Sequence, residues 1–184
     1  MSNPLKIMAS VSAALLAACV ATSPAGEGSK TESGETRDPS VILSIGEKAP
    51  AFEAKDEVGR TVRLEDYRGK SNVVLIFYPG DDTPGCTKQL CAARDDYAKY
   101  QALDAVVFGV NPAGQESKQA FSNKYDFPFP LLADTEGTLV RDYGCRGIGG
   151  ITTRTVYAIN KDGVIVFAER GMPSSETILA SLGG

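Results

Sequence analysis

Apolar residues follow one another without interruption in two short segments, 73–77 and 105–110. Such runs are typical of β-strands buried on both faces, and we expect the first strand to extend to residue 79. Two weaker segments, 46–52 and 61–64, lie on either side of a glycine-containing turn and predict a pair of opening strands. The pattern therefore predicts a β-sheet with a strongly buried centre.

Helical spacing of apolar residues marks three other segments. In 86–101 the apolar residues recur three or four positions apart, which predicts a helix with one inward-facing side. A second helix is predicted over 115–125. A closing helix is predicted over 174–182, with Ser174 or Ser175 as its N-cap. These helices alternate with the strands along the chain.

A β-hairpin is predicted near the end of the chain. The segments 155–159 and 164–168 flank a turn-forming Asn-Lys-Asp-Gly sequence at 160–163. Strands that alternate with helices, followed by a hairpin and a helix, predict a three-layer α/β domain with a central mixed β-sheet flanked by helices. No internal repeat is visible.

The first residues resemble a targeting signal. Lys6 precedes an apolar, small-residue stretch, 7–18, which is too short to span a bilayer as a helix but suits the core of a signal peptide. The Leu-Ala-Ala-Cys sequence at its end resembles the bacterial lipoprotein signal. We therefore predict a lipoprotein signal peptide over 1–18 and a lipid on Cys19 after cleavage. The alternative is a buried N-terminal helix that happens to end in cysteine.

A polar segment separates Cys19 from the predicted domain. Between 21 and 40 only two alanines are apolar, so this stretch cannot bury enough surface to fold. We predict a lipidated cysteine and flexible tether over 19–40, and a folded domain over 41–184. A lipid on Cys19 implies an extracytoplasmic protein anchored to a membrane.

The amino-acid composition argues against several classes of function. The chain has 184 residues, a net charge of −4 and no histidine. An acidic chain carries no basic surface for nucleic acid. Without histidine, neither a Ser-His nor a Cys-His hydrolase pair can form. The cysteines, at 19, 86, 91 and 145, lack the paired short spacings of a structural zinc site, so we expect no metal.

Cys86 is the residue with the most informative position. It follows the predicted strand at 73–79 and a turn, and it begins the predicted helix at 86–101. The unpaired N–H groups and positive dipole at a helix N-terminus favour a thiolate. With a second cysteine at Cys91, this arrangement indicates a thiol enzyme with two-electron redox chemistry.

The segment around Cys86 resembles the active-site motif of peroxiredoxins. Pro79-x-x-x-Thr83-x-x-Cys86 matches that motif, and Cys91, five positions on, resembles the Q-type group named after bacterioferritin comigratory protein. Three further segments resemble this family in the same order along the chain: Ala49-Pro50-x-Phe52, 121–134 and Arg154-Thr155-Val156-Tyr157-Ala158-Ile159.

The resemblance implies a thioredoxin-like fold and a thiol-dependent peroxidase without metal or organic cofactor. It also implies a monomer that is reduced by a thioredoxin-like partner. In this interpretation the Cys86 thiolate attacks the peroxide and becomes a sulfenic acid. The Thr83 hydroxyl contacts the peroxide, Pro79 keeps water out of the pocket, and Arg154 stabilises the thiolate and the separating oxygens.

Each of these residues also has a simpler interpretation. Thr83 could only cap the helix, Pro79 could only end the strand, and Arg154 could be a solvated charge. Carboxylates at Asp81 and Asp82 would disfavour a nearby thiolate, and we interpret them as solvated turn residues.

Cys91 is predicted to be the resolving thiol. Five residues along an α-helix give a rise of about 7.5 Å and a rotation of about 140°, so the two Cα atoms lie about 9 Å apart. A disulfide needs roughly 7 Å or less, so oxidation is predicted to unwind the first turns of the helix. The alternative for Cys91 is a buried apolar filler. Cys145 is either a second resolving thiol or, as we favour, an incidental loop cysteine.

Two other functions compete with the peroxidase. A membrane-anchored thiol–disulfide oxidoreductase would share the fold, but that class generally has Cys-x-x-Cys, whereas four residues separate Cys86 from Cys91. A non-enzymatic ligand-binding lipoprotein would have no reason to combine Pro79, Thr83, Cys86 and Arg154.

Overall fold

Seven strands form one mixed β-sheet in the computed structural model, which describes residues 37–183. The predicted signal peptide, Cys19 and most of the predicted tether lie outside the described residues. The strands are β1 (Glu53–Lys55), β2 (Thr61–Arg63), β3 (Asn72–Phe77), β4 (Ala105–Asn111), β5 (Leu131–Ala133), β6 (Thr155–Ile159) and β7 (Ile165–Arg170). They are arranged in the order β2-β1-β5-β4-β3-β6-β7.

The centre of the sheet is parallel and its two sides are antiparallel. Strands β3, β4 and β5 run parallel to one another. On one side β6 and β7 continue the sheet in antiparallel pairs, and on the other side β1 and β2 do the same. The mixed sheet that the sequence predicts is therefore confirmed.

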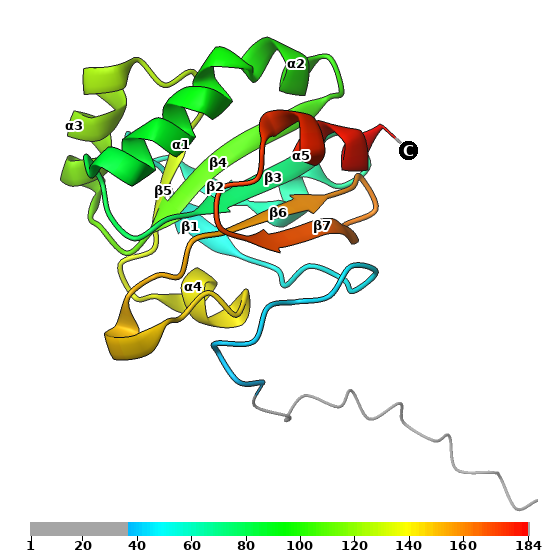
Figure 1. The fold of residues 1–184 in the computed structure, drawn as a ribbon, viewed down its shortest axis with the longest axis horizontal. Coiled ribbons are helices and arrows are strands. Elements are labelled where there is room, and N and C mark those ends of the chain that lie inside the picture. The colour runs from blue at the N-terminus through cyan, green and yellow to red at the C-terminus, as the bar shows by residue number, and fades with distance from the viewer. Residues whose placement is uncertain (1–36, 184) are drawn as a thin grey trace, which may run out of the picture. The chain divides into compact units, whose positions relative to one another are not determined.

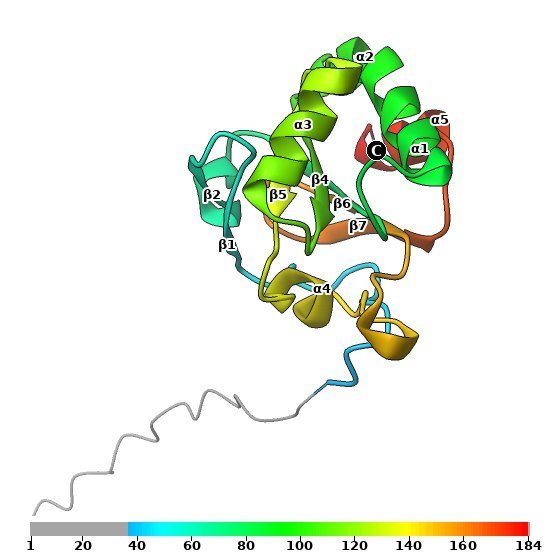
Figure 2. The same cartoon turned by 90° about the vertical axis from the view of Figure 1, so that its left-hand side faces the viewer.

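Helices cover both faces of the sheet unequally (Figures 1 and 2). One face carries α1, α2, α3 and α5, and the other carries α4. Their bounds are Pro84–Asp95 (α1), Tyr97–Gln101 (α2), Gln115–Tyr125 (α3), Thr138–Asp142 (α4) and Ser175–Leu182 (α5); two short 3-10 helices span Leu64–Tyr67 and Ile148–Gly150.

Alternate residues of the central strands enter two separate hydrophobic clusters, because successive side chains of a strand point to opposite faces. Leu75 and Phe77 of β3 pack with Tyr143 on the face that carries α4. Ile76 packs with Leu90 of α1 on the opposite face. Every residue of β3 is buried, as the uninterrupted apolar run predicts.

Several predicted elements are confirmed with small shifts. The helix over 115–125 is α3, the hairpin is β6 and β7, and the closing helix is α5. Ser174 is the N-cap of α5, where its hydroxyl accepts a hydrogen bond from the Thr177 N–H at 3.2 Å. The predicted central strand ends at Phe77 rather than at 79.

The prediction of a strand over 46–52 is wrong. The strand that pairs with β2 is β1, which begins at Glu53, and the preceding segment makes only an isolated bridge from Lys48 to Val164. Pro50 interrupts the segment because proline has no N–H to donate to a β-ladder.

The helix predicted over 86–101 is longer at its start and broken near its end. It begins at Pro84, since the fixed φ of proline suits the first helical position. It is divided at Asp96, which lies outside α-helical geometry with φ −95° and ψ 7°. The elements β5 and α4 are not predicted from the sequence, because segments of three to five residues show too little periodicity.

The last residues of the predicted tether contact the folded part. The Pro39 carbonyl oxygen accepts a hydrogen bond from the Arg146 N–H at 3.0 Å, and the Ser40 carbonyl oxygen accepts one from Arg170. Within the described residues, no helix combines the length and apolar character needed to cross a membrane.

Candidate active site

Cys86 lies in the first turn of α1 and is completely buried. Thr83 occupies the N-cap position, and its carbonyl oxygen accepts the first helical hydrogen bond from the Thr87 N–H at 2.8 Å. This geometry directs the positive end of the helix dipole toward the sulfur, as the sequence predicts. A buried thiol at this position has little contact with water and depends on nearby protein groups for charge stabilisation.

Arg154 supplies a positive charge directly at this sulfur. Its Nη2 group donates a hydrogen bond to Cys86 Sγ at 3.2 Å. The sheet explains the contact, because β6 pairs antiparallel with β3 and places Thr155 opposite Phe77. Arg154 therefore lies beside the end of β3, where the chain turns toward α1. An arginine in contact with a buried sulfur is not a solvated surface charge.

Gly85 leaves room for this arginine. A Cβ atom at Gly85 would lie 3.3 Å from Arg154 Nη2, which is a tight contact that the guanidinium would have to relieve. A glycine before Cys86 therefore lets the arginine approach the helix N-terminus closely.

Gln89 holds Arg154 in place and is not among the site residues predicted from the sequence. Its Oε1 atom accepts a 2.5 Å hydrogen bond from Arg154 Nη1, and its Nε2 group donates to the Gly171 carbonyl oxygen at 3.4 Å. The Gly171 N–H in turn donates to the Arg154 carbonyl oxygen at 2.9 Å. The position of Gln89 in the sequence could have indicated this role, because a residue three positions after Cys86 lies on the same face of the helix.

Thr83 and Pro79 lie on the loop that leads into α1, and both are exposed. The Thr83 hydroxyl donates to the Gly80 carbonyl oxygen at 3.3 Å and makes no capping hydrogen bond to α1. Pro79 follows the buried Tyr78 at the end of β3. The roles predicted for Thr83 and Pro79 at the peroxide remain predictions.

Cys91 lies on the same helix as Cys86 and is half-buried. It packs against the cluster on the α1 face, and no disulfide joins the three described cysteines. Because α1 is continuous from Pro84 to Asp95, the two thiols are held apart by helical geometry.

Cys145 lies in a different part of the molecule. It is completely buried in the cluster on the α4 face, whereas Cys86 belongs to the cluster on the opposite face. Burial raises the pKa of the Cys145 thiol to about 12. Its Sγ donates to the Tyr143 carbonyl oxygen at 3.3 Å. These features are those of a packed core thiol rather than a reactive one.

The interpretation of Asp81 as a solvated turn residue is wrong. Its side chain is 5% exposed and forms an ion pair with the fully buried Lys118 at 3.0 Å. Asp82 is exposed, as expected, and pairs with the exposed Lys124. Turn composition alone could not separate these two neighbouring carboxylates, because the burial of Asp81 depends on its contacts with Ser117 and Lys118 of α3.

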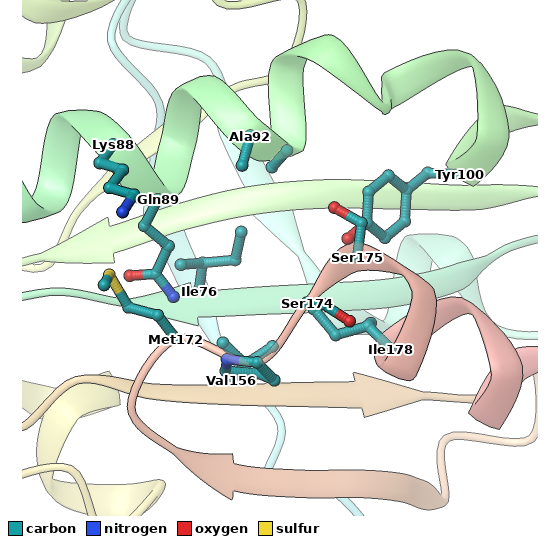
Figure 3. Close-up of a pocket in the computed structure, with 12 residues that line it drawn as sticks. Ile76, Lys88, Gln89, Ala92, Tyr100, Val156, Met172, Ser174, Ser175 and Ile178 are labelled. Atoms are coloured by element: carbon teal, nitrogen blue, oxygen red, sulfur yellow. The ribbon is translucent and has the colours of Figure 1, made fainter.

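A cavity of about 220 Å³ lies between α1 and α5, next to this site. Figure 3 shows Gln89 and Met172 at one end of the cavity and Tyr100 with Ser175 at the other. Neither Cys86 nor Arg154 lines it, so the cavity borders the candidate site through Gln89 without containing the sulfur. One of its walls is α1, the helix that carries both predicted redox cysteines.

Among residues 37–183, no cluster of three or more histidine, cysteine or carboxylate side chains is suited to hold a metal ion. A buried cysteine at a helix N-terminus, paired with an arginine in a mixed α/β fold, defines a thiol-based redox protein.

Comparison with known proteins identifies the family. Residues 45–168 match the model of the AhpC/TSA family, and the chain belongs to this family and to its peroxiredoxin Q and Bcp group. It is 39% identical over 140 residues to chloroplastic peroxiredoxin Q of Sedum lineare, which covers 74% of this chain and 75% of that protein. It is 40% identical over 135 residues to peroxiredoxin Bcp of Bacillus subtilis, covering 68% and 84%.

Solved structures agree with this assignment. The crystal structure of peroxidoxin BcpB from Mycobacterium tuberculosis has a TM-score of 0.72 and 30% sequence identity, and the match covers 77% of this chain and 97% of that one. The predicted thioredoxin-like fold is therefore confirmed. The protein is a thiol-dependent peroxidase of the peroxiredoxin class. The family assignment does not favour the two alternative functions, a thiol–disulfide oxidoreductase and a non-enzymatic ligand-binding lipoprotein.

Proposed function

We propose that the protein reduces hydrogen peroxide and organic hydroperoxides through a Cys86 sulfenic acid. The observation that carries this proposal is the 3.2 Å contact between Arg154 Nη2 and the sulfur of a fully buried Cys86. A positive guanidinium stabilises a thiolate and, during the reaction, the negative charge that develops on the departing oxygen.

The chemical step is a displacement at oxygen. The Cys86 thiolate attacks the terminal oxygen of R–O–O–H, an S–O bond forms, and the O–O bond breaks. The sulfur loses two electrons, and the alkoxide or hydroxide that leaves takes up a proton from water. Arg154 stays charged throughout because guanidinium does not deprotonate in proteins.

We propose that Cys91 then resolves the sulfenic acid. Its thiolate attacks the Cys86 sulfur, an S–S bond forms, and hydroxide leaves and is protonated to water. Since the intact helix α1 separates the two Cα atoms by about 9 Å, this step requires its first turns to unwind. A thioredoxin-like dithiol partner then reduces the Cys86–Cys91 disulfide by exchange, which restores both thiols.

For the N-terminal part we propose a lipid on Cys19, cleavage after residue 18 and an extracytoplasmic location on a membrane. The support is the sequence pattern described above and the polar stretch that follows it. Incorporation of a labelled fatty acid that is lost in Cys19→Ser would support the anchor. Incorporation at an unchanged level in that variant would contradict it. We propose a monomer, which size-exclusion chromatography of the detergent-solubilised protein tests.

Peroxide consumption by the purified protein with a dithiol reductant tests the catalytic proposal. Cys86→Ser is expected to abolish consumption. Cys91→Ser is expected to complete one turnover, to accumulate sulfenic acid on Cys86, and then to stop or to depend on an external thiol. Mass mapping after one equivalent of peroxide is expected to find a Cys86–Cys91 bond. Unchanged consumption in Cys86→Ser, or a disulfide between other cysteines, would overturn the proposal.

A further inference from the structure

A buried polar network lies beneath the loop that carries the start of α1. Its centre is the Lys118 ammonium group on α3, whose side chain is completely buried. Its three N–H donors go to three acceptors, Tyr78 Oη at 2.9 Å, Asp81 Oδ1 at 3.0 Å and Asn111 Oδ1. An ammonium group has three protons, so every one of them is used.

Asp81 is the counterpart of Lys118 in this network. Besides the ammonium, its carboxylate accepts hydrogen bonds from Tyr78 Oη at 2.7 Å, Asn111 Nδ2 at 2.9 Å and Ser117 Oγ at 2.7 Å. Burial acts to raise the pKa of Asp81, but Lys118 and these hydroxyl donors outweigh it and hold the pKa below its usual value. Asp81 is therefore a buried carboxylate that stays charged.

The network joins the loop at 79–83 to three elements. Tyr78 follows β3, Asn111 ends β4, and Lys118 belongs to α3. The loop itself contributes Asp81, five residues before Cys86. A satisfied buried network of this kind holds its members in one arrangement, whereas removal of one partner leaves a buried charge unpaired.

The network lies close to the reactive sulfur, because Tyr78 and Cys86 belong to the same buried cluster. Burial lowers the pKa of Lys118 to about 8, while Asp81 and a negative charge on Cys86 act to raise it, and Asp134 does so more weakly. The pKa of Tyr78 is raised by its burial and by Asp81, and a negative Cys86 raises it further. Since Tyr78 accepts a hydrogen bond from Lys118, the network borders the sulfur through this cluster.

We propose that Lys118 is a positioning residue of the peroxidase site. It neutralises the buried charge of Asp81, five residues before Cys86, and the ion pair between Lys118 and Asp81 fixes the 79–83 loop at the start of α1. Without Lys118, a buried and unneutralised carboxylate would remain on the loop that leads to Cys86, and a negative charge there disfavours a thiolate. The proposal deepens the proposed function and rests on it, since it assigns Lys118 to the support of Cys86.

The test compares how fast iodoacetamide alkylates Cys86 in the full-length protein, measured at pH 7 by site-resolved mass spectrometry. Lys118→Met removes the cation, and alkylation is expected to be about tenfold slower. Asp81→Asn removes the anion, and alkylation is expected to be equal or faster. The double variant has neither charge and is expected to return to within about threefold of wild type.

These directions separate an electrostatic role from a merely structural one. Loosening of the loop alone would change alkylation in the same direction in both single variants. Equal slowing in Lys118→Met and Asp81→Asn, or an unchanged rate in Lys118→Met, would overturn the proposal. If Lys118→Met does not fold, the double variant is compared with Asp81→Asn, and it must react more slowly.

Lys124 provides the matched control. It is a second lysine on α3 and pairs with Asp82, the neighbour of Asp81, but its side chain is 55% exposed against 0% for Lys118. Lys124→Met is expected to leave alkylation within about twofold of wild type, because an exposed pair is screened by water. Alkylation of Cys86 is measured without peroxide turnover. The proposed peroxidase function is tested separately, by peroxide consumption in Cys86→Ser, so the two proposals can fail independently.

Discussion

The surroundings of Cys86 are built by side chains that are distant in the sequence. The helix N-terminus is local, but Arg154 comes from the loop before β6 and reaches the sulfur at 3.2 Å. Gln89 fixes the other side of the guanidinium. The guanidinium therefore has one N–H group on the sulfur and one on an amide oxygen, which restricts its orientation.

Arg154→Gln removes the cation at the sulfur. We expect the second-order rate constant for peroxide reduction to fall by about 100-fold, as is common when a donor to developing negative charge is removed. Stopped-flow mixing with hydrogen peroxide measures this constant. Arg146→Gln, which changes an exposed arginine in the preceding loop, is the control and should have little effect. A similar loss in both variants would contradict a specific role.

Gln89→Leu removes the acceptor that orients Arg154. We expect a loss of about tenfold in the same rate constant, since a displaced catalytic group loses reactivity even when it is present. Gln89→Glu keeps an oxygen acceptor and should recover much of the orientation. The predicted order is wild type, then Gln89→Glu, then Gln89→Leu. A Gln89→Leu variant as fast as wild type would show that the guanidinium needs no such support.

The helix α1 has two conflicting tasks. In the folded state it presents Cys86 to Arg154, and in the proposed cycle its first turns unwind so that Cys91 can reach the sulfur. Lys88 and Ala92 are exposed and line the cavity shared with α5, so this side of α1 is loosely packed. A helix with little packing on part of its surface costs less free energy to unwind.

Lys88→Gly tests the unwinding step. Lys88 is exposed and lies between the two cysteines, so glycine weakens the helix by about 1 kcal/mol without removing a core contact. Disulfide formation after one equivalent of peroxide is expected to be about fivefold faster than in wild type, measured by quenched-flow alkylation and mass spectrometry. Lys88→Ala removes the same side chain but keeps helix propensity, so it is the control. Equal rates in both variants would show that unwinding does not limit the step.

The sheet divides the molecule into two chemically different sides. One side carries α1 and the candidate active site, and the other holds Cys145 among the packed side chains beside α4. A thiol on the second side is separated from Cys86 by a layer of buried strands. This separation agrees with the incidental interpretation of Cys145.

Cys145→Ser is therefore expected to leave steady-state peroxide turnover unchanged within about twofold, and its effect should be on stability. The pKa of Cys145 is raised to about 12 in the folded protein, whereas an unfolded cysteine ionises near ~8.5. Above pH 8.5 the unfolded state thus loses its proton first, and this thiol lowers the free energy of unfolding by up to about 1.4 kcal/mol per pH unit.

Urea unfolding at pH 8 and pH 10 measures this effect, and Cys145→Ser should reduce the decrease seen in wild type. Burial also raises the pKa values of Tyr143 and Tyr157. These two tyrosines therefore lower the free energy of unfolding at high pH in wild type and in Cys145→Ser alike. A lower peroxide turnover in Cys145→Ser would instead make Cys145 part of the catalytic cycle.

Local sequence determined the elements with strong patterns. The buried strands β3 and β4, the helix α3 and the hairpin of β6 and β7 follow from uninterrupted apolar runs, helical spacing and a turn sequence. The position of Cys86 at a helix N-terminus follows in the same way, because a strand, a turn and Pro84 specify it locally. The short elements β5 and α4 could not be predicted from local sequence. Strand β5 is ordered by pairing with β1 and β4, and α4 is ordered by packing in the core cluster on its face of the sheet.

Tertiary structure alone decided which groups meet at the sulfur and which charges are buried. Arg154 contacts Cys86 only because β6 pairs with β3, and Gln89 contacts Arg154 only once that pairing exists. Asp81 and Asp82 are identical neighbours in the sequence, yet one is buried against Lys118 and the other is exposed. The physical reason is that charge and burial depend on long-range packing, which residue type and spacing do not specify.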